Sequence, residues 1–178
     1  MAVEALGDLV PRIAPSAFVH PRATVIGDVE IGDHSSIWPG AVLRGDFGSI
    51  RVGRRTSVQD NAVLHTDGNG TVIGDDCILG HLAFVENAVV EDLCLIGVGA
   101  VLHGAVLRTG AVAAAGTVIV GGMEVPPDHR AQGVPARLVS PARPDRDYIR
   151  QGAARYVEMA RRYGQTPSAE IGQDVHSG

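Results

Sequence analysis

Branched aliphatic residues recur at every sixth position over long stretches of this chain. The first run is Ile13, Val19, Val25, Ile31, Ile37 and Leu43. The later runs are Val52, Val58 and Leu64, then Val72, Ile78, Phe84, Val90, Ile96 and Leu102, and after a change of register Val106, Val112 and Val118. A helix repeats its apolar face about every 3.6 residues and a strand about every two, whereas a period of six is typical of hexapeptide β-helix repeats. The pattern therefore predicts an all-β solenoid over residues 13–120.

Three hexads make one triangular coil, so about 18 residues advance the chain by one strand spacing of about 4.8 Å. Two interruptions break this count. The spacing is nine residues between Leu43 and Val52 and eight between Leu64 and Val72. Insertions in a solenoid form loops, often on its binding face, so we expect both loops to lie near a functional site.

The periodicity changes in the last part of the chain. Residues 121–144 contain five prolines and cannot form the interior of a helix. From residue 145, apolar residues recur at helical spacing, namely Ile149, Ala153, Tyr156, Val157, Ala160 and Tyr163. We therefore predict a β-helix with its lead-in and connecting segment over 1–144, a helix over 145–163 against the solenoid or a neighbouring subunit, and a flexible tail over 164–178.

Composition narrows the class of protein. The chain has 178 residues, 4% aromatic residues and 23 glycines, which fits one narrow prism with many tight turns. Its net charge is −5 and it has no basic stripe, so we expect no nucleic-acid partner. It has no signal-peptide pattern and no run of 18 apolar residues, which predicts a cytoplasmic protein without membrane contact. Cys77 and Cys94 match no metal or redox motif, so we expect them to be buried.

Two potential metal ligands fall on one face of the predicted solenoid. Counting hexads places Val85 one coil below His65, so His65 and Glu86 lie one coil apart with an offset of one residue. A separation of about 5 Å suits shared coordination of a metal ion. His81 lies near a different corner of the triangle, so only a neighbouring subunit could bring it to the same metal. The spacing therefore predicts a three-ligand site shared between the chains of a cyclic trimer.

A solvated turn residue is the plain alternative for every histidine in such a fold. We adopt that interpretation for His20, His34, His129 and His176.

Several segments together are similar to the gamma-class carbonic anhydrase family. They are Arg-Gly-Asp at 44–46, Ser-Val-Gln-Asp-Asn at 57–61, Val-Leu-His-Thr at 63–66, Gly-His at 80–81 and Gly-Val-Pro-Ala at 133–136. The resemblance covers nearly the whole chain, including the terminal helix. It implies a trimer of left-handed β-helices with a metal at each subunit interface. The left-handed sense comes only from this resemblance, because crossovers are ordinarily right-handed.

The resemblance also implies a ligand set. Three histidines bind the metal in that family, the first and third from one chain and the second from its neighbour. The first matches His65, the second matches His81, and the third position is occupied by Glu86. Zinc is the metal we expect, with Fe²⁺ or Co²⁺ as alternatives. Because a carboxylate partly neutralises the metal charge, we expect weaker CO₂ hydration than a three-histidine site supports.

An alternative is that Glu86 does not bind the metal. His103 lies one coil below Val85 on the same face, where it could orient Glu86 by a hydrogen bond or replace it as a ligand. A solvent-facing turn histidine is the plain alternative for His103.

Other family positions imply catalytic roles. Arg44 and Asp46 match residues beside the metal pocket, with an intersubunit salt bridge as the alternative. Gln59 matches a glutamine that hydrogen-bonds metal-bound water or bicarbonate, and Asp60 matches an acidic partner of Arg44. Tyr156 matches a tyrosine of the terminal helix that approaches the pocket, with helix packing as the alternative.

One departure from the family bears on proton transfer. Phe47 replaces the glutamate that follows Arg-Gly-Asp in the most active members, and no long acidic loop is present. The leading hypothesis is therefore a metal-binding homologue with weakened hydration of CO₂. The alternatives are a non-catalytic trimeric scaffold, which could bind a small ligand, and a hexapeptide acyltransferase.

Overall fold

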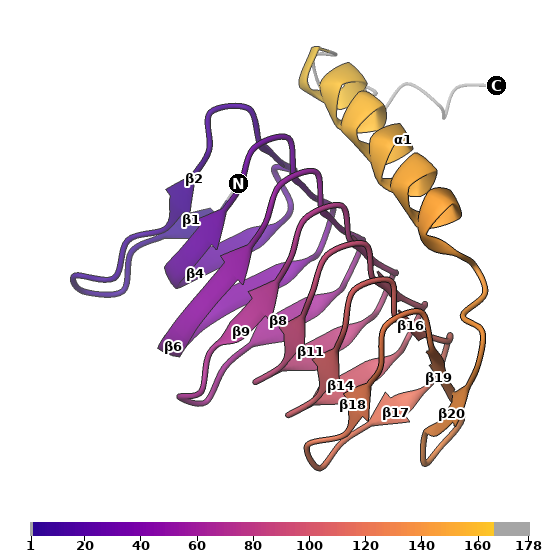
Figure 1. Cartoon of the computed structure of the whole chain (residues 1–178). Helices are drawn as coiled ribbons and strands as arrows, with labels where there is room; N and C mark the ends of the chain where they lie inside the picture. Colours follow the sequence, from indigo (N-terminus) through magenta and orange to yellow (C-terminus); the bar gives the residue numbers. More distant parts are fainter. Residues whose placement is uncertain (1, 166–178) are drawn as a thin grey trace, which may run out of the picture.

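The computed structural model describes residues 2–165. Short parallel strands stack into triangular coils, and one helix runs along the side of the stack (Figure 1). The predicted left-handed β-helix of hexapeptide repeats with a C-terminal helix is confirmed. Within the described part of the chain, no helix has the length and apolar character needed to cross a membrane.

The strands form three faces. The first face contains β1 (Ala2–Glu4), β4 (Thr24–Ile31), β6 (Val42–Val52), β8 (Val63–His65), β11 (Phe84–Glu86), β14 (Val101–His103) and β17 (Val118–Ile119). The long strands β4 and β6 continue onto the second face, which adds β2 (Arg12–Ile13), β9 (Thr71–Ile73), β12 (Val89–Val90), β15 (Val106–Leu107) and β18 (Glu124–Val125).

The third face contains β3 (Phe18–Val19), β5 (Ser36–Ile37), β7 (Ser57–Val58), β10 (Ile78–Leu79), β13 (Leu95–Ile96), β16 (Val112–Ala113) and β19 (Arg130–Gln132). These strands pair in parallel, and the antiparallel strand β20 (Arg137–Val139) closes the end of this sheet.

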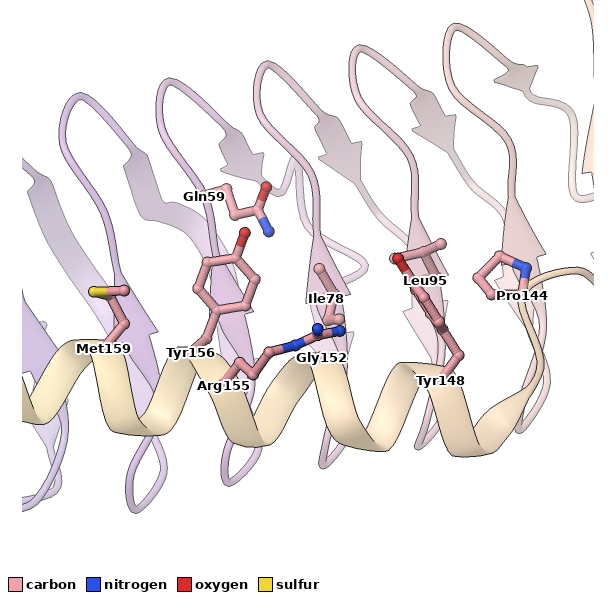
Figure 2. A pocket seen from close by; sticks show the side chains of 9 residues that line it. All are labelled: Gln59, Ile78, Leu95, Pro144, Tyr148, Gly152, Arg155, Tyr156 and Met159. Atoms are coloured by element: carbon pink, nitrogen blue, oxygen red, sulfur yellow. The ribbon is translucent and has the colours of Figure 1, made fainter.

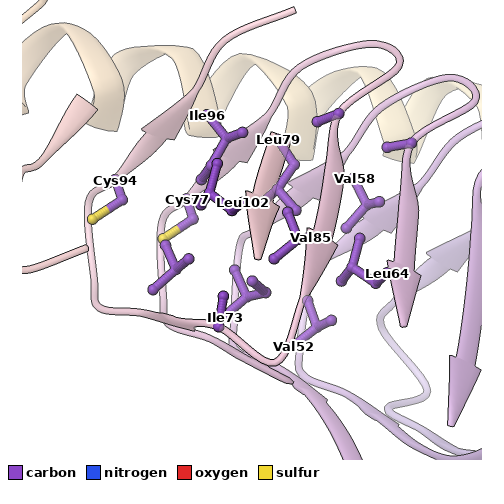
Figure 3. Packing of buried hydrophobic residues seen from close by; sticks show 14 of the residues in the cluster. Val52, Val58, Leu64, Ile73, Cys77, Leu79, Val85, Cys94, Ile96 and Leu102 are labelled. Carbon is purple, nitrogen blue, oxygen red and sulfur yellow. The ribbon is translucent and has the colours of Figure 1, made fainter. Parts of the chain in front are cut away.

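Each face sends one column of aliphatic side chains into the prism, because every coil is paired in register with the next (Figure 3). The first-face column is Val25, Leu43, Leu64, Val85, Leu102 and Ile119. The second-face column is Ile31, Val52, Ile73, Val90, Leu107 and Val125. The third-face column includes Ile37, Val58, Leu79 and Ile96. Cys77 and Cys94 are fully buried beside it, as expected.

The predicted core register is wrong by one residue in the middle of the chain. The buried residues there are Ile73, Leu79 and Val85, whereas Val72 is 41% exposed. The insertion after Leu64 is three residues long instead of two. Three hexads would advance the register by 18 positions, whereas the coils that end at β8 and β11 each advance it by 21. Ile78 and Phe84, also counted as core, therefore point outward from the prism.

The same correction applies at the end of the solenoid. The inward residues there are Leu107, Ala113 and Ile119 and not their neighbours Val106, Val112 and Val118. It also removes the predicted offset in the candidate site, because Glu86 pairs directly with His65.

Helix α1 (Arg146–Gln165) covers the third face of its own chain and contacts β3, β5, β7 and β10. Ile149 and Ala153 pack against Ile78 and Val112, which explains why these outward residues are buried. Packing against the solenoid of the same chain is therefore the arrangement observed, out of the two that the sequence left open.

The helix bounds differ slightly from the predicted 145–163. Asp145 precedes the helix and caps it, since its Oδ1 accepts the backbone N–H of Tyr148 at 3.1 Å. At the other end Arg161 donates to the side chain of Gln165 at 3.2 Å, and the helix continues through the first two residues of the predicted tail. The rest of that tail, 166–178, lies outside the described residues.

Candidate metal centre

Four polar residues form a column on the outside of the first face. Arg44 pairs in register with His65, His65 with Glu86, and Glu86 with His103. In each strand the residue directly before the polar one points into the core. The alternation of a β-strand therefore turns all four outward, one above the other.

Asp46, which lies beside the irregular part of β6, also faces this column. The backbone is close to a neighbouring coil at Gly45, where a Cβ atom would lie 2.6 Å from the carbonyl oxygen of Asp28. Only glycine fits that approach. Asp46 follows Arg44 by two positions on the same side of β6, so its carboxylate contacts His65, a contact that was not predicted from the sequence.

The His65 ring is held between two carboxylates. Its Nδ1 lies 2.5 Å from Oε1 of Glu86, and its Nε2 lies 3.0 Å from Oδ1 of Asp46. The side chains are 13% exposed for His65 and 17% for each carboxylate. Arg44 forms a salt bridge with the other oxygen of Asp46, and Nε2 of His103 lies 3.6 Å from Oε2 of Glu86.

The surroundings of Asp46 favour its ionised form. Burial acts against ionisation, but hydrogen bonds from a backbone amide, from His65 and from Arg44 outweigh it and lower the pKa of this carboxyl. Asp46 is therefore a fixed negative charge beside the imidazole.

Phe47 lies at the rim of this cluster. Its side chain is 70% exposed, and its ring lies edge-on to His65 with 6.5 Å between the ring centroids. An apolar ring thus lies at the rim, where a carboxylate would be needed to transfer protons.

The other predicted site residues form a second cluster at the corner after the third face. Nδ1 of His81 lies 3.0 Å from Oδ2 of Asp60. The neighbouring Gln59 is 5% exposed and faces Tyr156 of α1. Burial, reinforced by the negative charge of Asp60, raises the pKa of the Tyr156 phenol, and the positive charge of Arg155 and the nearby Gln59 only partly offset this.

The predicted residues are thus divided between two clusters of one chain. We name each cluster after the half of a shared site that it would supply. The first-half cluster is Arg44, Asp46, His65 and Glu86, and the second-half cluster is Gln59, Asp60, His81 and Tyr156. The ion pairs follow this division, since Asp60 pairs with His81 and Arg44 with Asp46. Over residues 2–165, no group of three His, Cys, Asp or Glu side chains is arranged to hold a metal ion.

Comparison with known proteins identifies the family. The model of the bacterial transferase hexapeptide (six repeats) matches residues 11–45. Gamma carbonic anhydrase 2 from the mitochondria of Arabidopsis thaliana is 37% identical over 162 residues, which cover 86% of this chain and 58% of the plant protein. A probable carbonic anhydrase from Methanocaldococcus jannaschii is 36% identical over 151 residues, which cover 83% of this chain and 95% of that protein. The chain belongs to the gamma-class carbonic anhydrase family.

Relatives with other names share the same architecture. The crystal structure of a putative acetyltransferase from Bacillus cereus superimposes with a TM-score of 0.87 and 33% identity, covering 91% of this chain and 96% of that one. Relatives named as carbonic anhydrases and as a putative acetyltransferase share this fold, so the fold alone does not distinguish CO₂ hydration from acyl transfer.

Proposed function

We propose that this gamma carbonic anhydrase homologue binds a divalent metal at the subunit interfaces of a homotrimer and hydrates CO₂ at a reduced rate. His65 and Glu86 of one chain and His81 of the next would hold the metal. Two histidines and one glutamate form an established zinc set, so zinc is the metal we propose, with Fe²⁺ or Co²⁺ as alternatives. The cytoplasmic location stays a prediction.

The first-half cluster fits the chemistry of such a ligand set. Glu86 faces Nδ1 of His65, so this nitrogen and the carboxylate are the two donors that one chain offers. Asp46 faces the opposite nitrogen. A carboxylate in that position fixes the tautomer and orientation of a metal-bound histidine, and Arg44 in turn holds Asp46.

A bound metal would supply a water molecule of lowered pKa. The chain's own residues bind and orient the substrate: Arg44 offers a guanidinium to bicarbonate, and Gln59 and Tyr156 offer an amide and a phenol from the second-half cluster. Glu86 adds a negative charge next to the metal, which opposes the lowering of the water pKa. Proton export is slower with Phe47 at the rim than with a carboxylate there.

The observation that carries this proposal is that His65 and Glu86 lie side by side on paired coils with their side chains facing each other. The test compares the wild type with Glu86→His and Glu86→Ala by elemental analysis and stopped-flow CO₂ hydration. We expect the wild type to bind metal and hydrate slowly, Glu86→His to hydrate faster, and Glu86→Ala to lose metal. If Glu86→His bound metal but gained no rate, the role given to the glutamate would be wrong.

A non-catalytic scaffold is the second candidate function. Both ring nitrogens of His65 already have carboxylate partners within one chain, so the cluster is satisfied by protein groups alone. A wild-type trimer that takes up no zinc, Fe²⁺ or Co²⁺ would favour this candidate.

Acyl transfer is the third candidate function, because the Bacillus cereus relative is named a putative acetyltransferase. Thermal stabilisation by acetyl-CoA, retained in Glu86→Ala, would favour acyl transfer over both other candidates.

A further inference from the structure

A cavity of about 710 Å³ lies between α1 and the third face of the solenoid (Figure 2). Ile78 and Leu95 line it from the strands, and Tyr148 and Met159 line it from the helix. Small-molecule sites in proteins have volumes of roughly 300–1,000 Å³. Carbon dioxide and bicarbonate are far smaller than this cavity, so the proposed hydration leaves most of its volume and its apolar walls unused.

Two polar groups meet at the wall of this cavity that belongs to the solenoid. Gln59 is only 5% exposed, and its amide lies beside the phenol of Tyr156 (Figure 2). Buried polar side chains of this kind orient ligands in otherwise apolar pockets. The Tyr156 phenol, whose pKa burial raises further, is protonated at neutral pH.

One cation lines the same cavity from the helix. Arg155 contacts the face of the Tyr148 ring, with 5.9 Å between its guanidinium carbon and the ring centroid. The structure shows no carboxylate paired with Arg155 among residues 2–165. By contrast, Arg146, Arg150 and Arg161 of the same helix each pair with an acidic residue. The Arg155 charge is therefore available to an anion in the cavity.

We propose that this cavity binds a small organic carboxylate with an apolar body. The carboxylate pairs with Arg155, the apolar body lies against Ile78, Leu95 and Met159, and the Gln59–Tyr156 pair contacts the end of the ligand away from the helix surface. This site shares Gln59 and Tyr156 with the proposed hydration site but goes beyond the proposed function, because its ligand needs no metal and bicarbonate has no apolar body.

The test measures binding of benzoate and hexanoate by calorimetry and ligand-observed NMR, with acetate and benzamide as probes that lack the apolar body or the charge. The full-length protein is used in its zinc-loaded form and after chelation. We expect benzoate and hexanoate to bind both forms alike, and acetate and benzamide to bind at least about tenfold more weakly. Equal binding of benzamide, or binding that disappears on chelation, would overturn the proposal. Failure of the CO₂ assay would not affect it.

Three variants locate the site. Arg155→Met should weaken benzoate binding about tenfold or more, since it removes a charge-assisted contact. Arg161→Met is the matched control, because it removes a guanidinium of the same helix outside the cavity and should leave binding unchanged. Leu95→Trp should fill the cavity and abolish binding.

The alternative occupant of the cavity is a second copy of this chain. Sedimentation of the wild type and Leu95→Trp distinguishes the two occupants. Loss of the trimer in Leu95→Trp, together with no benzoate binding to the wild type, would assign the cavity to a subunit contact and contradict the proposal.

Discussion

At the scale of single residues, the neighbours of His65 decide what the first-half cluster can do. Its ring touches Glu86 through Nδ1 and Asp46 through Nε2. If Nδ1 binds the metal, Asp46 must accept the proton on Nε2 and fix the plane of the ring. Under the proposed function, Asp46 would therefore position the ring and Glu86 would bind the metal.

This division of roles predicts the effect of removing Asp46. We expect Asp46→Ala to weaken zinc affinity by about 10- to 100-fold, the usual cost of losing a carboxylate behind a ligating histidine. Competition with a chromophoric chelator measures the affinity. Asp8→Asn, an exposed carboxylate remote from His65, is the control. Unchanged affinity in Asp46→Ala would mean that Asp46 only pairs with Arg44.

At the scale of strands and coils, the period of six predicted the β-helix but did not define its register throughout. Coils advance the register by 18 positions early in the chain, by 21 at β8 and β11, and by 17 between β11 and β14. Apolar residues occupy both inward and outward positions in several strands, so a count of hydrophobic residues cannot tell Val72 from Ile73. Only pairing between coils distinguishes them. The terminal helix was easier to predict, because its apolar positions repeat at a different period.

The same limits apply to the candidate site. The separation of His81 from His65 and Glu86 could be counted from the sequence, because the coil corner lies between them. The contact between Asp46 and His65 was missed. Its signal was the pairing of Arg44 with His65, because Asp46 lies two positions after Arg44 on the same side of β6.

The corrected register makes a direct prediction for β11 and β12. Val85 is fully buried and Val89 is 43% exposed. We expect Val85→Ala to lower the free energy of unfolding by about 2–3 kcal/mol, from lost burial and the cavity left behind. Val89→Ala should change it by less than about 0.5 kcal/mol. Denaturant unfolding of both variants checks this, and a larger loss for Val89→Ala would contradict the register.

At the scale of the whole molecule, stacking of coils brings arginines and carboxylates together along the edges of the prism. Arg54 pairs with Asp75, and Arg108 pairs with both Glu91 and Glu124. At Asp75, burial favours the protonated form but the hydrogen bonds from Arg54 outweigh it, and the pKa is lowered. Arg108 lowers the pKa of Glu91 and of Glu124.

These shifts predict acid sensitivity. A carboxyl group whose pKa is lower in the folded state contributes stability above its unfolded pKa and loses it as the pH falls through the folded value. We therefore expect the melting temperature to fall once the pH drops below the ordinary values of 4.5 for Glu and 3.8 for Asp. Asp75→Asn should melt lower at pH 7 and lose less on acidification. A wild-type melting temperature that stays constant from pH 7 to about pH 3 would contradict the shifts.

The division of the site between chains can be tested by subunit mixing. His65→Ala damages only the first-half cluster, and His81→Ala only the second. An interface in a mixed trimer is intact when His81→Ala supplies the first half and His65→Ala supplies the second, which is about one interface in four for a random equal mixture. We expect each variant alone to bind almost no zinc and the co-refolded mixture to regain about a quarter of the wild-type metal. A site built within one chain would regain none, because every chain in the mixture lacks one ligand.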